Sequence, residues 1–310
     1  MNNPPLWQTH AHGKLLLTGE YAVLDGALAL AVPARFGQSL RVDAGEKPGQ
    51  LSWVSRDMHG AVWFRASFSL PELTLLRTSN PTTSQVLQEV LLACRRQNPQ
   101  FPGDTAGLNV TTQTEFPHNW GLGTSSTLVA ALAQWANVDP YAVLAGSFGG
   151  SGYDIACAFA DGPLLFRLTD EGPSVQRVPF SPPFADRLFF VFLGKKQNSR
   201  DAIRHYRGYA KDNAGLPGAI SQLTRQCLEA QTLADFSAIL LEHERLTGAA
   251  IGLPRAQELY FPDFPGVVKS LGAWGGDFVL AAAKGSPAET RAYFAEKGFE
   301  VCVPYREMVW

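Results

Sequence analysis

The chain has 310 residues, of which 45% are hydrophobic and 17% are charged, and its formal net charge is −2. A chain of this length exceeds the usual size of one hydrophobic core, so we expect two domains. The near-neutral charge argues against nucleic-acid binding, and no apolar stretch reaches the roughly 18 residues of a membrane span. Four widely separated cysteines and an N-terminus without a signal-peptide pattern favour a cytoplasmic protein with neither a zinc site nor a disulfide framework.

The first hundred residues predict short strands followed by one helix. Residues 12–26 read as a strand, a Gly-Glu turn and a second apolar run, and residues 35–68 alternate as antiparallel strands do. Residues 83–98 have helical spacing and one apolar face. That face, which we expect in the core, consists of Val86, Leu87, Val90, Leu91 and Cys94. Lys14 is either a solvated strand end or a cation beside a phosphate or a reacting hydroxyl.

The stretch from Glu115 to Ser126 carries the strongest local signal. A β-type run precedes it and an alanine- and leucine-rich helical run follows it, with Gly121, Gly123 and three hydroxyl residues between them. Glycines allow close approach of a ligand, and the start of a helix offers unpaired N–H groups to a phosphate. The alternative is a glycine turn with a Ser or Thr cap, which is a common structural element.

A second glycine cluster follows the Asp139-Pro140 helix start. Residues 149–152 are Gly-Gly-Ser-Gly, and Asp154 then opens a short helix among apolar residues. An aspartate after a glycine cluster is often only a helix cap. A partly buried carboxylate at this place can also orient an acceptor hydroxyl or take its proton.

The proline-rich joint at 180–184 marks the predicted domain boundary. The part after it alternates strands and helices. We expect a strand over 187–194, a helix capped by Asn198 or Ser199, helices near 217–231 and 234–250, a glycine loop leading into a strand over 266–283, a helix over 287–297 and a strand over 299–304.

Basic residues gather after the first strand of this C-terminal part. They are Lys195, Lys196, Arg200 and Arg204, and the last two share a helical face by their i,i+4 spacing. A solvated basic face is the simpler interpretation. If the cluster instead faces a ligand, it suits a phosphorylated acceptor.

Well-known nucleotide motifs are missing from the sequence. It contains no G-x-x-x-x-G-K-[ST] loop, no G-x-G-x-x-G after a strand, and neither H-R-D nor D-F-G. A phosphoryl-transfer enzyme with this sequence must therefore bind phosphates with a different loop.

Three stretches together resemble, in order and spacing, the three motifs of the GHMP kinase family of galactokinases, homoserine kinases, mevalonate kinases and phosphomevalonate kinases. These stretches are residues 13–23, 121–126 and 271–277, and the resemblance extends from about residue 11 to residue 283. Gly-Glu-Tyr-Ala-Val at 19–23 and the Gly-Gly-Asp end of the third stretch look most like phosphomevalonate kinase. Residues 152–156, Gly-Tyr-Asp-Ile-Ala, also resemble a bacterial subgroup known by that signature.

This resemblance implies an α+β fold with a ribosomal-S5-like domain over residues 1–183 and a ferredoxin-like domain over 184–310. ATP and substrate would bind in the cleft between these domains. Mg²⁺ would be held with the help of Ser125, and Asp154 and Lys14 match the family's catalytic aspartate and first-motif lysine. The residues expected to bind ATP are Gly121, Leu122, Gly123, Thr124, Ser125, Ser126, Gly275 and Gly276.

The acceptor would be a small molecule, and the protein a monomer or homodimer. Asp154 would orient or deprotonate the acceptor hydroxyl, with Lys14 close enough to keep the carboxyl ionised. The residues expected to bind the acceptor are Glu20, Tyr21, Ser151, Lys195, Arg200, Trp274 and Asp277.

Two departures from the family pattern bear on function. Residues 124–127 are Thr-Ser-Ser-Thr where the family usually has Ser-Ser-Ala-Ala, and Val143 occupies the place of a glutamate that binds Mg²⁺ in mevalonate kinases. The first motif also differs from that of diphosphomevalonate decarboxylases. The prediction is thus a kinase of phosphomevalonate or mevalonate in isoprenoid precursor synthesis. A kinase of sugars or amino alcohols and an inactive nucleotide-binding regulator remain as alternatives.

Overall fold

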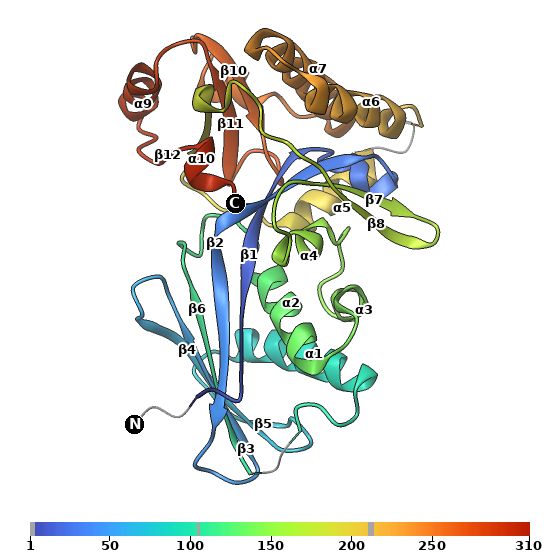
Figure 1. The fold of residues 1–310 in the computed structure, drawn as a ribbon, viewed down its shortest axis with the longest axis vertical. Helices are drawn as coiled ribbons and strands as arrows, with labels where there is room; N and C mark the ends of the chain where they lie inside the picture. The colour runs from blue at the N-terminus through green and yellow to red at the C-terminus, as the bar shows by residue number, and fades with distance from the viewer. Residues whose placement is uncertain (1–3, 104–105, 210–213) are drawn as a thin grey trace. The chain divides into compact units, whose positions relative to one another are not determined.

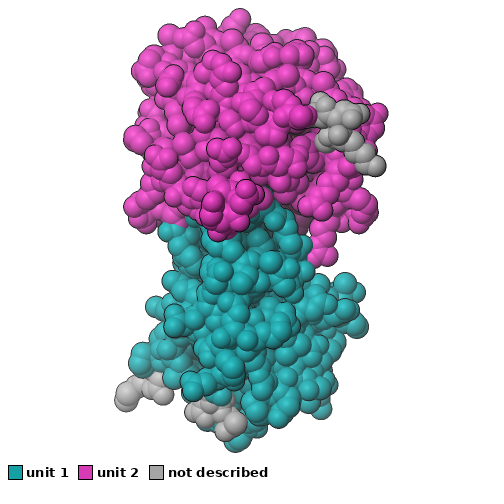
Figure 2. All heavy atoms as spheres, turned by 90° about the vertical axis from the view of Figure 1, so that its right-hand side faces the viewer, with its two compact units in different colours: residues 1–13, 36–118, 123–159 teal, residues 14–35, 119–122, 160–310 magenta. Residues whose placement is uncertain are grey.

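The computed structural model describes residues 4–103, 106–209 and 214–310, coloured along the chain in Figure 1. These residues form two compact units, which Figure 2 shows in different colours. Unit 1 comprises residues 1–13, 36–118 and 123–159, and unit 2 comprises residues 14–35, 119–122 and 160–310. Compactness thus groups residues 14–35 and 160–183 with the C-terminal part. The domain boundary after residue 183 stays a prediction.

Unit 1 contains a sheet covered by helices. Its strands follow the order β5–β4–β3–β6–β2, with β1 paired to β2. The bounds are β1 Trp7–Thr18, β2 Ala29–Ala44, β3 Gln50–Arg56, β4 Val62–Ser69, β5 Leu75–Thr78 and β6 Leu108–Thr114. The predicted antiparallel pairing is confirmed for β3 with β4, whereas β3 and β6 run parallel. Strand β1 begins in unit 1 and ends in unit 2, and β2 begins in unit 2 and ends in unit 1, so each of these strands has residues in both units.

The helices of unit 1 bury the apolar faces that the sequence predicted. They are α1 Pro81–Gln97, α2 Thr124–Ala136, α3 Pro140–Ala145 and α4 Tyr153–Ala158. On α1, Leu87, Val90, Leu91 and Cys94 are buried in a core cluster with strand residues such as Trp53. Val86, which we also expected in the core, is only half-buried. The predicted start of α3 is confirmed, because Asp139 caps it by accepting from the backbone of Tyr141. The sheet and helices together position the starts of α2 and α4.

Unit 2 contains a second sheet, in the order β10–β11–β9–β12, and a hairpin of β7 and β8 that pairs with the first residues of β2. The strands are β7 Leu164–Thr169, β8 Gly172–Arg177, β9 Leu188–Phe192, β10 Gly266–Ser270, β11 Phe278–Ala283 and β12 Cys302–Pro304. Every residue of β9 and of β11 is buried, as expected for continuous apolar strands covered on both faces.

Helices complete unit 2. They are η1 Ala22–Asp25, η2 Ala185–Arg187, α5 Ser199–Tyr209, α6 Leu216–Glu229, α7 Leu233–Ile251, α8 Ala256–Tyr260, α9 Pro287–Glu296 and α10 Tyr305–Met308. The predicted helices near 217–231, 234–250 and 287–297 are confirmed, and Asn198 caps α5 by accepting from the backbone N–H of Arg200 at 3.0 Å. None of the described helices combines the length and apolar character needed to cross a bilayer. The α+β class is confirmed.

Candidate functional site

The start of α2 is the first part of the candidate site. Gly123, the residue before the helix, has a φ of 93°, a backbone conformation that glycine adopts without strain. No described side chain caps this helix, so the N–H groups of its first turn have no side-chain acceptor. Unpaired N–H groups and the positive end of the helix dipole favour an anionic ligand such as a phosphate.

The hydroxyl residues of this first turn divide into two kinds. Ser126 and Thr127 are buried, and their hydroxyls donate to the Gly123 carbonyl at 2.8 Å and to Gln38 Oε1 at 2.7 Å. The Ser125 side chain is exposed, and Thr124 is half-buried. Ser125 is therefore the serine of this run whose hydroxyl is open to a ligand or metal ion.

Asp154 lies in the first turn of α4, a helix that packs on α2 within unit 1. The residue is half-buried, and its Oδ1 accepts from the backbone N–H of Ile155 at 3.0 Å. Gly152 precedes the helix with a φ of 89°, and a Cβ there would meet the ring of Tyr141. Ser151 is half-buried beside it. Tyr141 was missed by the sequence analysis, although its place just after Asp139-Pro140 fixed it on α3.

Lys14, in unit 2, holds the residues that lead to α2. Its Nζ donates to the carbonyl of Gly121 at 3.0 Å, and its backbone N–H donates to the carbonyl of Leu122 at 2.9 Å. Gly121 has a φ of 67°, and a Cβ built on it would overlap the carboxylate of Asp277. The lysine of the first motif, the glycine of the second and the aspartate of the third therefore form one cluster.

Asp277 is the acidic member of this cluster. It is 9% exposed and has a φ of 52°, and its Oδ1 accepts from the backbone N–H of Gln197 at 3.1 Å. Burial raises the pKa of this carboxyl above its usual value, while the charge of Lys14 opposes the rise. Gln197 also donates through Nε2 to the carbonyl of Gly275 at 3.2 Å, and a Cβ on Gly276 would overlap its side chain.

The first and third motifs are also joined by buried side chains. The hydroxyl of Tyr21 accepts from the backbone N–H of Trp274 at 2.8 Å, and the indole of Trp274 donates to the Pro254 carbonyl at 2.7 Å. The carboxylate of Glu20 has no exposed surface and lies 2.6 Å from Lys269 Nζ. These contacts fix the shape of both loops. A direct role of Glu20, Tyr21 or Trp274 with an acceptor stays a prediction.

Two further buried groups surround this ion pair, and the sequence analysis missed both. His243 accepts from the backbone N–H of Gly19 at 2.9 Å, and its pKa lies well below the usual value because of burial and then of Lys269. Glu244 accepts from the backbone N–H of Ser270 at 2.8 Å, and burial raises its pKa to about 8. Burial therefore favours the uncharged form of both His243 and Glu244.

Comparison with solved structures identifies the architecture. The chain aligns with mevalonate kinase of Methanococcus jannaschii at a TM-score of 0.71 and 13% identity, covering 96% of each chain. It aligns with phosphomevalonate kinase of Streptococcus pneumoniae, in complex with phosphomevalonate and AMPPNP, at 0.69 and 18%, covering 96% of this chain and 98% of that one. It aligns with Lactococcus lactis galactokinase, complexed with galactose, at a TM-score of 0.67 and 12% identity, covering 94% of this chain and 88% of that one.

The chain has the GHMP kinase fold. The expected fold is thereby confirmed over nearly the full length of the chain, although no protein-family model and no curated protein matches the sequence. Neighbours with this fold act on different acceptors, since phosphomevalonate and galactose are each bound in one of the crystal structures named above.

Within this GHMP kinase fold, Mg²⁺ has few protein ligands available. Among the described residues, no group of three His, Cys, Asp or Glu side chains is arranged to hold a metal ion. Val143 is fully buried in the apolar core of unit 1, and its side chain has no atom that can bind a metal ion. The exposed hydroxyl of Ser125 is an oxygen donor of the kind Mg²⁺ prefers, and Mg²⁺ at nucleotide sites takes its other ligands from phosphates and water. The residues present fit a metal ion bound largely through the nucleotide.

Two members of the basic cluster have separate partners within unit 2. Lys195 Nζ lies 5.9 Å from the ring centroid of Tyr260, and Arg204 forms an exposed ion pair with Asp201 at 3.0 Å. Arg200 is exposed at the start of α5. The assignment of Lys195 and Arg200 to an acceptor stays a prediction.

Proposed function

We propose that this protein is an ATP-dependent kinase that phosphorylates a small molecule, with phosphomevalonate or mevalonate as the acceptor. The observation that carries the proposal is the uncapped start of α2, with Ser125 exposed beside it, in a fold shared with small-molecule kinases. A neighbour with the same fold is a phosphomevalonate kinase in complex with phosphomevalonate and AMPPNP.

The chain's own groups suit phosphoryl transfer, which depends mainly on positioning and on neutralising phosphate oxygens. The N–H groups of residues 124–126 would bind phosphate oxygens, and Lys14 would keep Gly121 and Leu122 in the conformation that presents them. Mg²⁺, when bound, would neutralise phosphate charge. Ser125 would be its protein ligand.

Asp154 is the proposed base or orienting group for the acceptor hydroxyl. Its carboxylate is half-buried, and its Oδ1 accepts from the backbone N–H of Ile155. A carboxylate in the first turn of a rigid helix can orient a hydroxyl with little loss of entropy. The Tyr141 ring against Gly152 keeps the start of this helix in place.

The acceptor is the finer part of the proposal. Phosphomevalonate is favoured over mevalonate if Lys195 and Arg200 bind its phosphate, since a dianion needs cationic partners. The galactose complex of a neighbour with the same fold keeps a sugar as the second candidate acceptor. An inactive nucleotide-binding regulator is the third possibility that the experiment separates.

The test is a coupled ADP-release assay with mevalonate, 5-phosphomevalonate, homoserine and several sugars. We expect turnover with phosphomevalonate or mevalonate, and a loss of at least about 10²-fold in kcat for Asp154→Asn with ATP binding retained. Asp170→Asn, an exposed carboxylate in the turn between β7 and β8, is the matched control and should retain activity. ATP binding without turnover of any acceptor would favour the regulator, and near-full kcat in D154N would refute the role of Asp154.

A further inference from the structure

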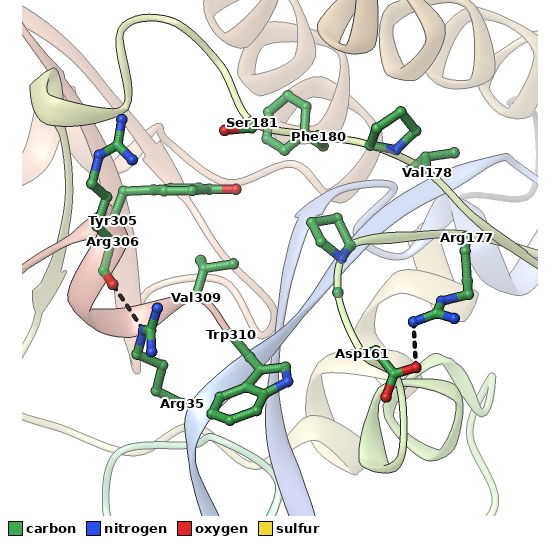
Figure 3. Close-up of a pocket in the computed structure, with 13 residues that line it drawn as sticks. Arg35, Asp161, Arg177, Val178, Phe180, Ser181, Tyr305, Arg306, Val309 and Trp310 are labelled. Carbon is green, nitrogen blue, oxygen red and sulfur yellow. Dashed lines mark hydrogen bonds and ion pairs between the residues drawn. The ribbon is translucent and has the colours of Figure 1, made fainter.

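A pocket of about 600 Å³ is lined only by residues of unit 2, and none of them belongs to the three motifs (Figure 3). Its wall is formed by Arg35 of β2, the loop before β7, the end of β8 with the linker after it, and the C-terminal residues. Nothing in the phosphotransfer proposal uses these residues. A volume of this size suits a small organic ligand.

The charges around the pocket are mainly positive. Arg35, Arg177 and Arg306 line it, and Asp161 is the acidic residue among its lining side chains. Arg177 forms an ion pair with Asp161. Arg35 donates through Nε to the carbonyl of Arg306 at 2.9 Å, which holds its guanidinium at the wall. Arginines at fixed positions favour a ligand with several anionic oxygens.

Tyr305 supplies a polar group at the base of the pocket. The residue is 5% exposed, and its buried hydroxyl makes no hydrogen bond to a described residue. Figure 3 shows the ring extending toward the middle of the pocket with the hydroxyl foremost. Burial raises the pKa of Tyr305, so the group stays a neutral hydroxyl that can donate. A buried hydroxyl without a partner costs free energy, which an acceptor atom of a ligand would recover.

The remaining wall is apolar and partly aromatic. Phe180 and Val309 are 7% and 6% exposed, and the guanidinium of Arg35 lies 5.8 Å from the centroid of the Trp310 ring. Such a wall accommodates a short hydrocarbon or aromatic body next to the anionic group. The pocket thus combines a cationic side, one hydroxyl donor and an apolar side.

We propose that this pocket binds a small phosphate monoester, with the phosphate at the arginines and Tyr305 and the organic body against Trp310 and Phe180. A phosphate monoester offers three terminal oxygens to the arginines and the Tyr305 hydroxyl together, whereas a carboxylate offers two. None of its lining residues belongs to the α2 loop, so we propose an effector site and not a second place of phosphoryl transfer.

The test is isothermal titration calorimetry with phenyl phosphate, on the full chain saturated with AMPPNP so that the proposed nucleotide site is occupied. We expect one binding site, about tenfold weaker binding in Tyr305→Phe, and a similar or larger loss in Arg35→Gln. Arg177→Gln, whose side chain is largely exposed, should also weaken binding and gives a second variant if Arg35→Gln fails to fold. Arg245→Gln, an exposed arginine of α7 paired with Glu242, is the matched control and should bind as the wild type does.

Three outcomes would overturn the proposal. They are equal binding of phenol, equal binding by all the pocket variants, and complete displacement of phenyl phosphate by AMPPNP. Because binding is measured directly, a protein without kinase activity can still support the site, and an active kinase can still lack it.

Discussion

Replacing Lys269 by methionine should destabilise unit 2 strongly. Both partners of the Lys269–Glu20 pair have no exposed side-chain surface, and their charged atoms are 2.6 Å apart. Removing one member of a buried ion pair leaves the other charge uncompensated, which typically costs about 3–5 kcal/mol. Lys269 also donates to the carbonyl of Ser270 at 2.8 Å, and that bond is lost as well.

The cost should depend on pH in a defined direction. Burial already raises the pKa of Glu20, and Lys269 is the main influence that lowers it. Without the lysine, the buried Glu20 carboxyl of the folded protein favours its protonated form, whereas Glu20 of the unfolded chain loses its proton above the ordinary pKa of a glutamate. The deficit of the variant should therefore be smaller at pH 5 than at pH 8.

Hydrogen exchange measured by mass spectrometry at pH 5 and pH 8 reports the local opening free energy of peptides that contain Glu20 and β10. Glu20→Gln combined with Lys269→Met removes both charges and should recover part of the loss. Lys297→Met breaks an exposed pair with Asp263 at 2.8 Å and should cost less than about 1 kcal/mol. A Lys269→Met protein as stable as the wild type at both pH values would refute the reasoning.

Three further substitutions test neighbouring contacts. Gly121→Ala should lower the free energy of unfolding by about 1–3 kcal/mol, because its Cβ meets Asp277. The control Gly298→Ala, with a φ of 86° and open space around it, should cost only the backbone strain of about 1 kcal/mol. Equal losses of the two variants in chemical denaturation would contradict this prediction. The stability of Glu244→Gln relative to the wild type should increase as pH rises from 4.5 to 8. In the wild type the Glu244 carboxyl stays protonated in the folded state and ionises in the unfolded state, so the free energy of unfolding falls by about 1.4 kcal/mol per pH unit over this range. Parallel curves of stability against pH for the two proteins would disprove the prediction. Tyr21→Phe should cost about 1–3 kcal/mol by leaving the buried Trp274 N–H unpaired, and an unchanged melting temperature would argue against that.

The sequence by itself determined the local elements and the order of the motifs. The apolar face of α1, the Asp139 cap and the glycines around α2 and α4 are decided by neighbours within a few residues. Because the family motifs are also local, their order was enough to predict the GHMP kinase fold.

Only the tertiary structure decided which distant groups meet. The sequence gives no sign that Glu20 pairs with Lys269 beside His243, that Asp277 lies against Gly121, or that Tyr305 faces a pocket lined by arginines. The parallel pairing of β3 with β6 is equally non-local. A side chain's local pattern sets its helix or strand and its face, but its burial and its partner depend on how segments far apart in the chain pack together.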